Sequence, residues 1–185
     1  MGNQASHPIR HRMDHCFHQI NAVDIALCLR FNRSSRRAWV RCLFCIVSRL
    51  GDGLFWYAVM LGILLAQGSA GVLPCLHMMA AGVTGTLIYK AIKGQASRPR
   101  PFEVNQAIAL GLPPLDRFSF PSGHTLHAVL FTTVALGYYP MLAWLLLPFT
   151  LLVAASRVVL GLHYPTDVLA GAVIGVLIAR ISFML

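Results

Sequence analysis

The sequence predicts an all-α fold, that of a polytopic helical membrane protein with about five to six transmembrane helices and basic amphipathic helices at its N-terminus. Two observations lead to this prediction. Of the 185 residues, 57% are hydrophobic and only 11% are charged, whereas a soluble domain carries about 25% charged residues. The apolar residues are also gathered in blocks rather than scattered along the chain. We therefore expect lipid to surround most of the molecule.

Five apolar blocks qualify as candidate membrane spans. Some fall short of the ~20 residues that a perpendicular helix needs, but aromatic flanks such as Trp56 and Trp144 can extend them into the membrane interface. Between the third and fourth blocks, Tyr139-Pro140 predicts a tight turn. The candidate spans cover approximately residues 53–67, 73–88, 126–138, 141–152 and 168–185.

The first 50 residues form a separate basic segment in this interpretation, and residues 51–185 form the membrane domain. The formal net charge of +9 is uneven, because eight arginines precede position 50. Nucleic-acid binding would explain such a run, but nothing in the sequence resembles a nucleic-acid module, so no nucleic-acid partner is expected. We expect instead two basic amphipathic helices, over about 22–31 and 35–50, that lie on anionic headgroups.

The cysteines and N-terminal histidines raise the question of a metal site. Five cysteines, an odd number, are interpreted as small buried apolar residues rather than as disulfides or metal ligands. Four histidines, at positions 7, 11, 15 and 18, recur at roughly helical spacing, but no carboxylate or cysteine completes a site at a convincing distance. We expect these histidines to face headgroups, and we predict neither a metal site nor a cofactor.

Polar residues concentrate in two loops, at about 90–123 and 156–167. Two candidate helices separate the loops, so both loops lie on the same face of the membrane. Taken singly, each polar residue there has a structural explanation: cations at helix ends reach headgroups, and a serine caps a helix. Taken together, they are expected to converge at one surface: Lys93, Arg100, Ser122, Gly123, His124, Arg157, His163 and Asp167.

Such a cluster suits a phosphate group. A phosphate charge of about −2 requires several cations, and Lys93, Arg100 and Arg157 supply three, with arginine able to grip two oxygens at once. A helix that starts at Ser122-Gly123 offers backbone N–H groups and the positive end of the helix dipole. The missing side chain of Gly123 lets the backbone approach the anion closely.

The two histidines are expected to have different chemical roles. The four-residue spacing of His163 and Asp167 allows the carboxylate to accept a hydrogen bond from one ring nitrogen, leaving the other nitrogen unprotonated and aimed at phosphorus. That imidazole can attack and form a phosphohistidine. His124 can protonate the departing oxygen and then activate water. This scheme requires no metal.

The pattern resembles the type 2 phosphatidic acid phosphatase superfamily, whose members share an active site with vanadium haloperoxidases. Three motifs carry the resemblance: K-x6-R-P from Lys93 to Pro101, P-S-G-H from Pro121 to His124, and S-R-x5-H-x3-D from Ser156 to Asp167. The resemblance implies that residues 51–185 form the catalytic membrane domain. It makes His163 the nucleophile, Asp167 its partner and His124 the general acid, with the phosphate held by Lys93, Arg100, Ser122, Gly123 and Arg157.

The resemblance also implies the partners, which are a lipid phosphate substrate and membrane lipids. Undecaprenyl diphosphate is the expected substrate, with phosphatidylglycerophosphate, phosphatidate and lipid A as alternatives. A lipid phosphotransferase could use the same residues. A lipid-binding or transport protein is less favoured, because transport usually places polar groups near the bilayer midplane.

The resemblance places the protein in the bacterial inner membrane. With five spans, the arginine-rich N-terminus and the site share one face, which the positive-inside rule would make cytoplasmic. A sixth crossing over about 39–50 would reverse this, although Arg41 and Arg49 make it costly. Because similar family members usually face the periplasm or the exterior, we expect an extracytoplasmic site. The sequence does not predict the oligomeric state.

Overall fold

The computed structural model describes the backbone of residues 8–185 and the side chains of residues 19–185. The described chain is helical and contains no strand, which confirms the predicted all-α class. Short 3-10 helices lie at Arg33–Arg36 (η1), Gly68–Gly71 (η2) and Pro140–Leu142 (η3). The α-helices are α1 (Pro8–Asn32), α2 (Ala38–Gly51), α3 (Leu54–Gln67), α4 (Val72–Gln95), α5 (Pro101–Val104), α6 (Gly123–Tyr138), α7 (Ala143–Val159) and α8 (Pro165–Ser182).

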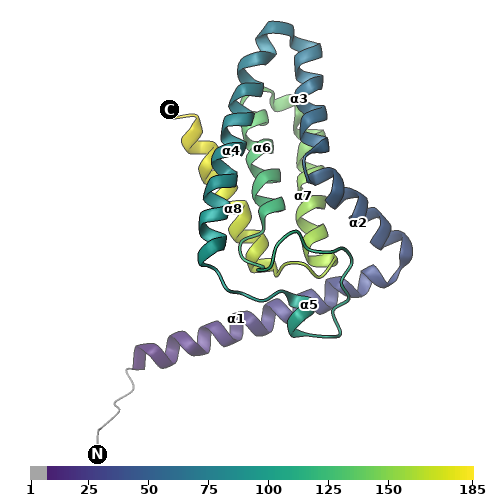
Figure 1. Ribbon diagram of the computed structural model, residues 1–185, viewed down its shortest axis with the longest axis vertical. Helices are drawn as coiled ribbons and strands as arrows, with labels where there is room; N and C mark the ends of the chain where they lie inside the picture. Colours follow the sequence, from purple (N-terminus) through teal and green to yellow (C-terminus); the bar gives the residue numbers. More distant parts are fainter. Residues whose placement is uncertain (1–7) are drawn as a thin grey trace, which may run out of the picture.

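Five helices form an elongated bundle, with α3, α4, α6, α7 and α8 running along its length (Figure 1). Helix α6 lies inside and contacts α4, α7 and α8, while α2 packs against α7. The chain reverses at η2 and η3. The lower end of the bundle in Figure 1 carries α1, α5 and the long loop between α5 and α6. The two polar loops therefore meet at one end, as the alternation of spans predicted.

Three helical runs of the described chain are long and apolar enough to cross a membrane: Leu54–Gln95, Pro140–Val159 and Pro165–Ser182. The first run has 42 residues and includes α3, η2 and α4, so it folds back on itself. Helix α6 has 16 residues, fewer than a perpendicular crossing needs. Large apolar side chains such as Leu65, Leu87 and Leu151 are exposed on the bundle. Together these features confirm a polytopic helical membrane protein.

Among the described helices, α6 packs most extensively against α8. A Cβ added at Gly171 would lie 2.5 Å from the carbonyl oxygen of Ser122, and one at Gly175 would lie 2.6 Å from that of Leu126. Only glycine fits at these two positions, which are one helical turn apart. Small residues at this spacing let membrane helices approach closely, and here they hold the start of α8 against the start of α6.

The N-terminal helices differ in part from the prediction. Helix α2 agrees with the expected segment 35–50 to within a few residues, but α1 begins well before residue 22 and ends at Asn32. Arginines 30, 33, 36, 37 and 41 are exposed, as headgroup contact requires. The inner face of α1 is unexpectedly polar, with Asp24, Cys28 and Asn32 buried. Asn32 Nδ2 donates to the carbonyl oxygens of Ala109 and Val159, so α1 is bonded to the lower end of the bundle.

Two sequence predictions stay predictions. The histidines at positions 7, 11, 15 and 18 lie outside the residues whose side chains are described. The division of the chain at residue 50 stays a prediction.

Candidate active site

The eight predicted site residues lie on helix ends and connections at the lower end of the bundle. Lys93 is in the last turn of α4, and Arg100 directly precedes α5. Ser122 directly precedes α6, which begins with Gly123 and His124. Arg157 is in the last turn of α7, His163 lies between α7 and α8, and Asp167 is in the first turn of α8. The motifs are thus brought together by helix ends.

A cavity of about 590 Å³ opens at this cluster. Its polar end is lined by five of the eight residues: Arg100, Gly123, His124, Arg157 and His163. The remaining wall is largely apolar and comes from α3, α4 and α6, with Trp56, Met60, Val83, Leu87 and Phe131 among its residues. Lys93, Ser122 and Asp167 do not line the cavity. The site therefore joins a cationic end to an apolar wall.

His163 is held differently from the sequence expectation. Its Nδ1 lies 2.6 Å from the carbonyl oxygen of Ser119 and 3.8 Å from Asp167 Oδ2. The second distance is too long for a hydrogen bond, so the predicted imidazole–carboxylate hydrogen bond is replaced by one to a backbone carbonyl. A carbonyl only accepts, which places the proton on Nδ1 and leaves Nε2 unprotonated.

The surroundings of His163 keep the ring neutral. Burial lowers the pKa of His163 to about 3, and the charges of Arg157 and Arg100 act in the same direction against the opposing effect of Asp167. Arg100 Nη1 lies 3.4 Å from Nε2. At neutral pH the ring is a free base whose unprotonated nitrogen is beside a guanidinium, which suits a nucleophile toward an anion held by that guanidinium.

Arg157 has unused hydrogen-bonding capacity in the cavity. Its side chain is buried, and Nη1 donates to Ser48 Oγ at 2.5 Å. Its Nε, also buried, has no hydrogen-bond partner among the described residues. An unpartnered buried donor is costly, and an oxyanion in the cavity would supply the missing acceptor.

A carboxylate that the sequence motifs do not contain faces the other two cations. Asp116 Oδ1 lies 2.7 Å from Lys93 Nζ and 2.5 Å from Arg100 Nη2, and its Oδ2 accepts a hydrogen bond from the Tyr89 hydroxyl. Burial favours the protonated carboxyl, but the hydrogen bonds from Lys93 and Tyr89 and the nearby cations outweigh it and lower the pKa of Asp116. An ionised side chain thus neutralises Lys93 and Arg100.

His124 also has an acidic neighbour that sequence reasoning missed. Asp52, at the junction of α2 and α3, forms an ion pair with His124 Nε2. Burial acts to raise the pKa of Asp52, yet the hydrogen bond and charge of His124 lower it overall. Burial and the charge of Arg157 lower the pKa of His124 overall, while the hydrogen bond and charge of Asp52 act in the opposite direction and favour the protonated ring that a general acid requires.

The start of α6 differs in one detail from the expected anion site. The Ser122 hydroxyl is fully buried and pairs with Thr125 Oγ1 at 2.9 Å, so it does not face the cavity. Gly123 does line the cavity. A Cβ at this position would lie 2.8 Å from the Tyr89 ring, so the glycine also makes room for Tyr89.

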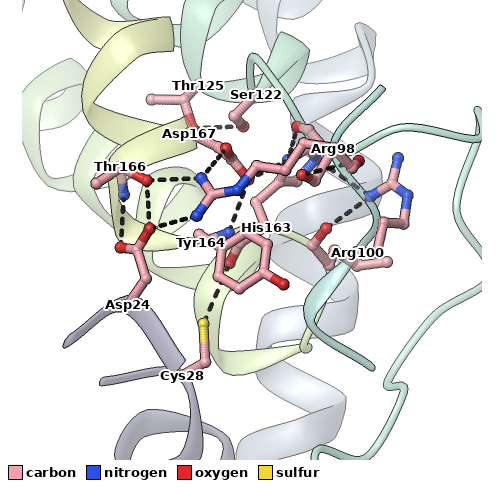
Figure 2. A network of polar contacts seen from close by, with 12 residues as sticks. Asp24, Cys28, Arg98, Arg100, Ser122, Thr125, His163, Tyr164, Thr166 and Asp167 are labelled. Atoms are coloured by element: carbon pink, nitrogen blue, oxygen red, sulfur yellow. Dashed lines mark hydrogen bonds and ion pairs between the residues drawn. The ribbon is translucent and has the colours of Figure 1, made fainter. Parts of the chain in front are cut away.

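Asp167 is surrounded by donors (Figure 2). Its Oδ2 accepts from the backbone N–H of Tyr164 at 2.9 Å, and its Oδ1 accepts from Arg98 at 2.8 Å. Arg98, two residues before the predicted Arg100, was not among the sequence candidates.

Among the described side chains, no group of three or more His, Cys, Asp or Glu could hold a metal ion, and independence from metal stays a prediction.

Comparison with known families gives one match that covers most of the site. The model of the PAP2 superfamily matches residues 71–185, which include all three motifs. Among curated proteins, the chain is 33% identical over 117 residues to undecaprenyl-diphosphatase BcrC of Bacillus subtilis. This match covers 58% of the chain and 56% of that relative, so the chain spans about half of its length.

A second relative and two solved structures match over a larger share of the chain. The undecaprenyl-diphosphatase of Sulfolobus acidocaldarius is 31% identical over 144 residues, which are 76% of this chain and 68% of that protein. The crystal structure of Aquifex aeolicus LpxE matches with a TM-score of 0.72 at 25% identity, over 85% of this chain and 93% of that one. A transmembrane PAP2-type phosphatidylglycerolphosphate phosphatase from Bacillus subtilis matches with a TM-score of 0.69 at 25% identity, over 90% and 85%.

Proposed function

The chain belongs to the PAP2 superfamily, and from this premise we propose that it is a membrane phosphatase that hydrolyses a lipid phosphate or diphosphate through a phosphohistidine on His163. The observation that carries the proposal is the state of His163. Its Nδ1 is bonded to Ser119, and its Nε2 is unprotonated beside Arg100, at the cationic end of a cavity with an apolar wall.

In the first step, His163 Nε2 attacks the terminal phosphorus and the bond from phosphorus to the lipid oxygen breaks. Arg100 and Arg157 stabilise the charge on the phosphoryl oxygens, together with the start of α6 at Gly123 and with Lys93 once its ion pair with Asp116 opens. His124 gives its proton to the departing oxygen, so the lipid product leaves protonated. Asp167 stabilises the positive charge that His163 acquires when the N–P bond forms.

In the second step, water attacks the phosphohistidine. His124, now neutral, takes a proton from this water, and the N–P bond breaks to release inorganic phosphate and regenerate His163. Each of the two histidines returns to its starting state.

Undecaprenyl diphosphate is the proposed substrate. Two relatives are named as undecaprenyl-diphosphatases, and the apolar wall of the cavity suits a lipid chain whose phosphate enters the cationic end. Phosphatidylglycerophosphate is the second candidate, because the structure named as its phosphatase matches over 90% of this chain.

The test is release of inorganic phosphate by the purified protein in detergent. Undecaprenyl diphosphate, phosphatidylglycerophosphate, phosphatidate and a lipid A are supplied separately, with His163→Ala as the control. Turnover of one lipid that is lost in His163→Ala supports the assignment. No release from any of them by a folded protein contradicts it and favours a phosphotransferase, for which transfer to a second lipid would be measured.

We also propose that the protein resides in the bacterial inner membrane with the site on its extracytoplasmic face. Two exposed positions at opposite ends of the bundle allow a test, Arg117 in the long loop and Ser69 in η2. In a background without native cysteines, an impermeant thiol reagent applied to whole cells should label Arg117→Cys and not Ser69→Cys. The reverse pattern would place the site in the cytoplasm.

A further inference from the structure

The catalytic carboxylate proposed above is one member of a chain of three charged groups (Figure 2). Arg98, in the segment between α4 and α5, donates from Nη1 to Asp167 Oδ1 at 2.8 Å and to Thr166 Oγ1 at 2.7 Å. Its guanidinium carbon lies 3.8 Å from the centre of the Tyr164 ring. The arginine is thus fixed on Oδ1 of Asp167, whereas His163 lies nearer to Oδ2.

A second carboxylate lies at the far side of Arg98. Asp24 of α1 accepts from Arg98 Nη2 at 2.7 Å, and it also accepts from the backbone N–H of Thr166 at 3.2 Å and from the Thr166 hydroxyl at 2.5 Å. Asp24 is only 2% exposed. Its partners lie more than 70 residues away in the sequence, so this buried carboxylate joins α1 to the site.

The charges of the three groups explain why two carboxylates are present. Arg98 alone would neutralise Asp167, and the positive charge that forms on His163 during attack would then find no net negative charge nearby. Asp24 balances Arg98, so the group Asp24–Arg98–Asp167 keeps a net charge of −1. Asp167 can therefore be held by an arginine and still stabilise an imidazolium whose Nδ1 is 3.8 Å away, in surroundings where charges interact strongly.

We propose that Asp24 and Arg98 are positioning residues that orient Asp167 and preserve its negative charge, so that α1 is part of the catalytic apparatus. The proposal rests on the proposed role of His163. Arg98 fixes the carboxylate in place, and Asp24 prevents the same arginine from cancelling its charge. The N-terminal helix then has a catalytic duty in addition to any contact with headgroups.

Two variants that change the net charge of this group should differ in kcat. Asp24→Asn leaves Arg98 to neutralise Asp167 and should lower kcat by about 10- to 100-fold, as loss of a group that orients a catalytic ligand commonly does, with KM within about twofold. Asp24→Asn/Arg98→Gln removes both outer charges and returns the group to −1. We expect this double variant to recover several-fold in kcat over Asp24→Asn.

A second readout does not depend on the lipid. Orthovanadate adopts the geometry of a phosphoryl group under attack, so its affinity, measured by calorimetry, should fall in Asp24→Asn and recover in the double variant. Asn21→Ala is the matched control, because Asn21 accepts from the same Arg98 Nη2 at 3.0 Å without carrying charge, and it should change neither readout more than about threefold. Gel filtration and thermal unfolding check that each variant is folded.

The outcomes separate the two proposals. If Asp24→Asn matches the wild type, or if the double variant is no faster than Asp24→Asn, the positioning role is overturned while the proposed function stands. A slow Asp24→Asn without recovery would mean that Asp24 only docks α1. If the wild type neither releases phosphate from any lipid nor binds vanadate, the proposed function fails and this inference fails with it.

Discussion

The ammonium of Lys93 lies 2.7 Å from the carboxylate of Asp116, although Lys93 belongs to the motif expected to hold phosphate. The same carboxylate contacts Arg100. A phosphate that binds to these two cations must compete with an anion that belongs to the protein itself. Asp116 lies in the long loop between α5 and α6, so the loop and the ligand are expected to exclude each other from the two cations.

Asp116→Asn should therefore strengthen phosphate binding. Loss of the competing charge is expected to lower the inhibition constant of inorganic phosphate by about three- to tenfold, as expected for a partly buried ion pair worth roughly 1 kcal/mol. Glu103→Gln is the control, because Glu103 accepts from the backbone N–H of Arg100 and forms no ion pair with Lys93 or Arg100. Weaker inhibition by phosphate in Asp116→Asn would mean that the carboxylate orients the cations rather than competes for them.

His124→Ala should lower kcat more for some substrates than for others. A general acid matters most for a poor leaving group, and a lipid phosphate leaves from a diphosphate more readily than an alcohol leaves from a monoester. We expect the loss in kcat to be at least about tenfold smaller for undecaprenyl diphosphate than for phosphatidate. Steady-state rates on both lipids measure this difference, and equal losses would argue against proton donation by His124.

The pKa of His163 predicts how stability depends on pH. The ring titrates near 6.5 in the unfolded chain and at about 3 in the folded one. Between these values the unfolded state binds a proton that the folded state does not. The free energy of unfolding should fall as the pH drops below about 6.5, by up to about 1.4 kcal/mol per pH unit, and this effect should end near pH 3.

Thermal unfolding in detergent between pH 7.5 and 5 checks this expectation. His163→Asn keeps a donor for Ser119 but has no titrating ring, so its apparent Tm should fall less steeply than that of the wild type. Parallel curves for the two proteins would show that His163 is protonated in the folded state.

Chelators should leave the activity unchanged. The proposed steps use imidazole, guanidinium, ammonium and carboxylate groups of the chain and place no metal ion between them. Phosphate release measured with and without excess EDTA, after dialysis against the chelator, should agree within experimental error. Loss of activity that returns on addition of a divalent cation would contradict the proposed mechanism.

Sequence patterns predicted the bundle and the eight motif residues because both are local or periodic signals. Apolar blocks follow from the need to face lipid, and the motifs are short and ordered. The start of α6 at Gly123 and the reversal near Pro140 were predicted from the same kind of local signal. The length of α1 was not predicted, because polar and apolar residues are mixed along its sequence and do not form a continuous apolar face.

The acidic residues around the site could not be predicted in the same way. Asp24, Asp52 and Asp116 lie outside every motif, and their partners are distant in sequence. One signal was available: the chain has only six acidic residues against 15 basic ones, and a buried acid in a membrane protein is usually functional. Of the five acidic residues whose side chains are described, four, including Asp167, form ion pairs with a predicted site residue or with Arg98. The small number of acidic residues made each of them a candidate, but only the structure showed which side chains they contact.

The most direct test of the central claim is to trap the intermediate. Purified protein is mixed rapidly with substrate labelled at the terminal phosphate, denatured, and analysed for label on the chain. We predict a label that is stable to base and labile to acid, that maps to His163, that is absent in His163→Ala and that accumulates in His124→Ala. Phosphate release without any label on the chain, or a label that persists in His163→Ala, would contradict it.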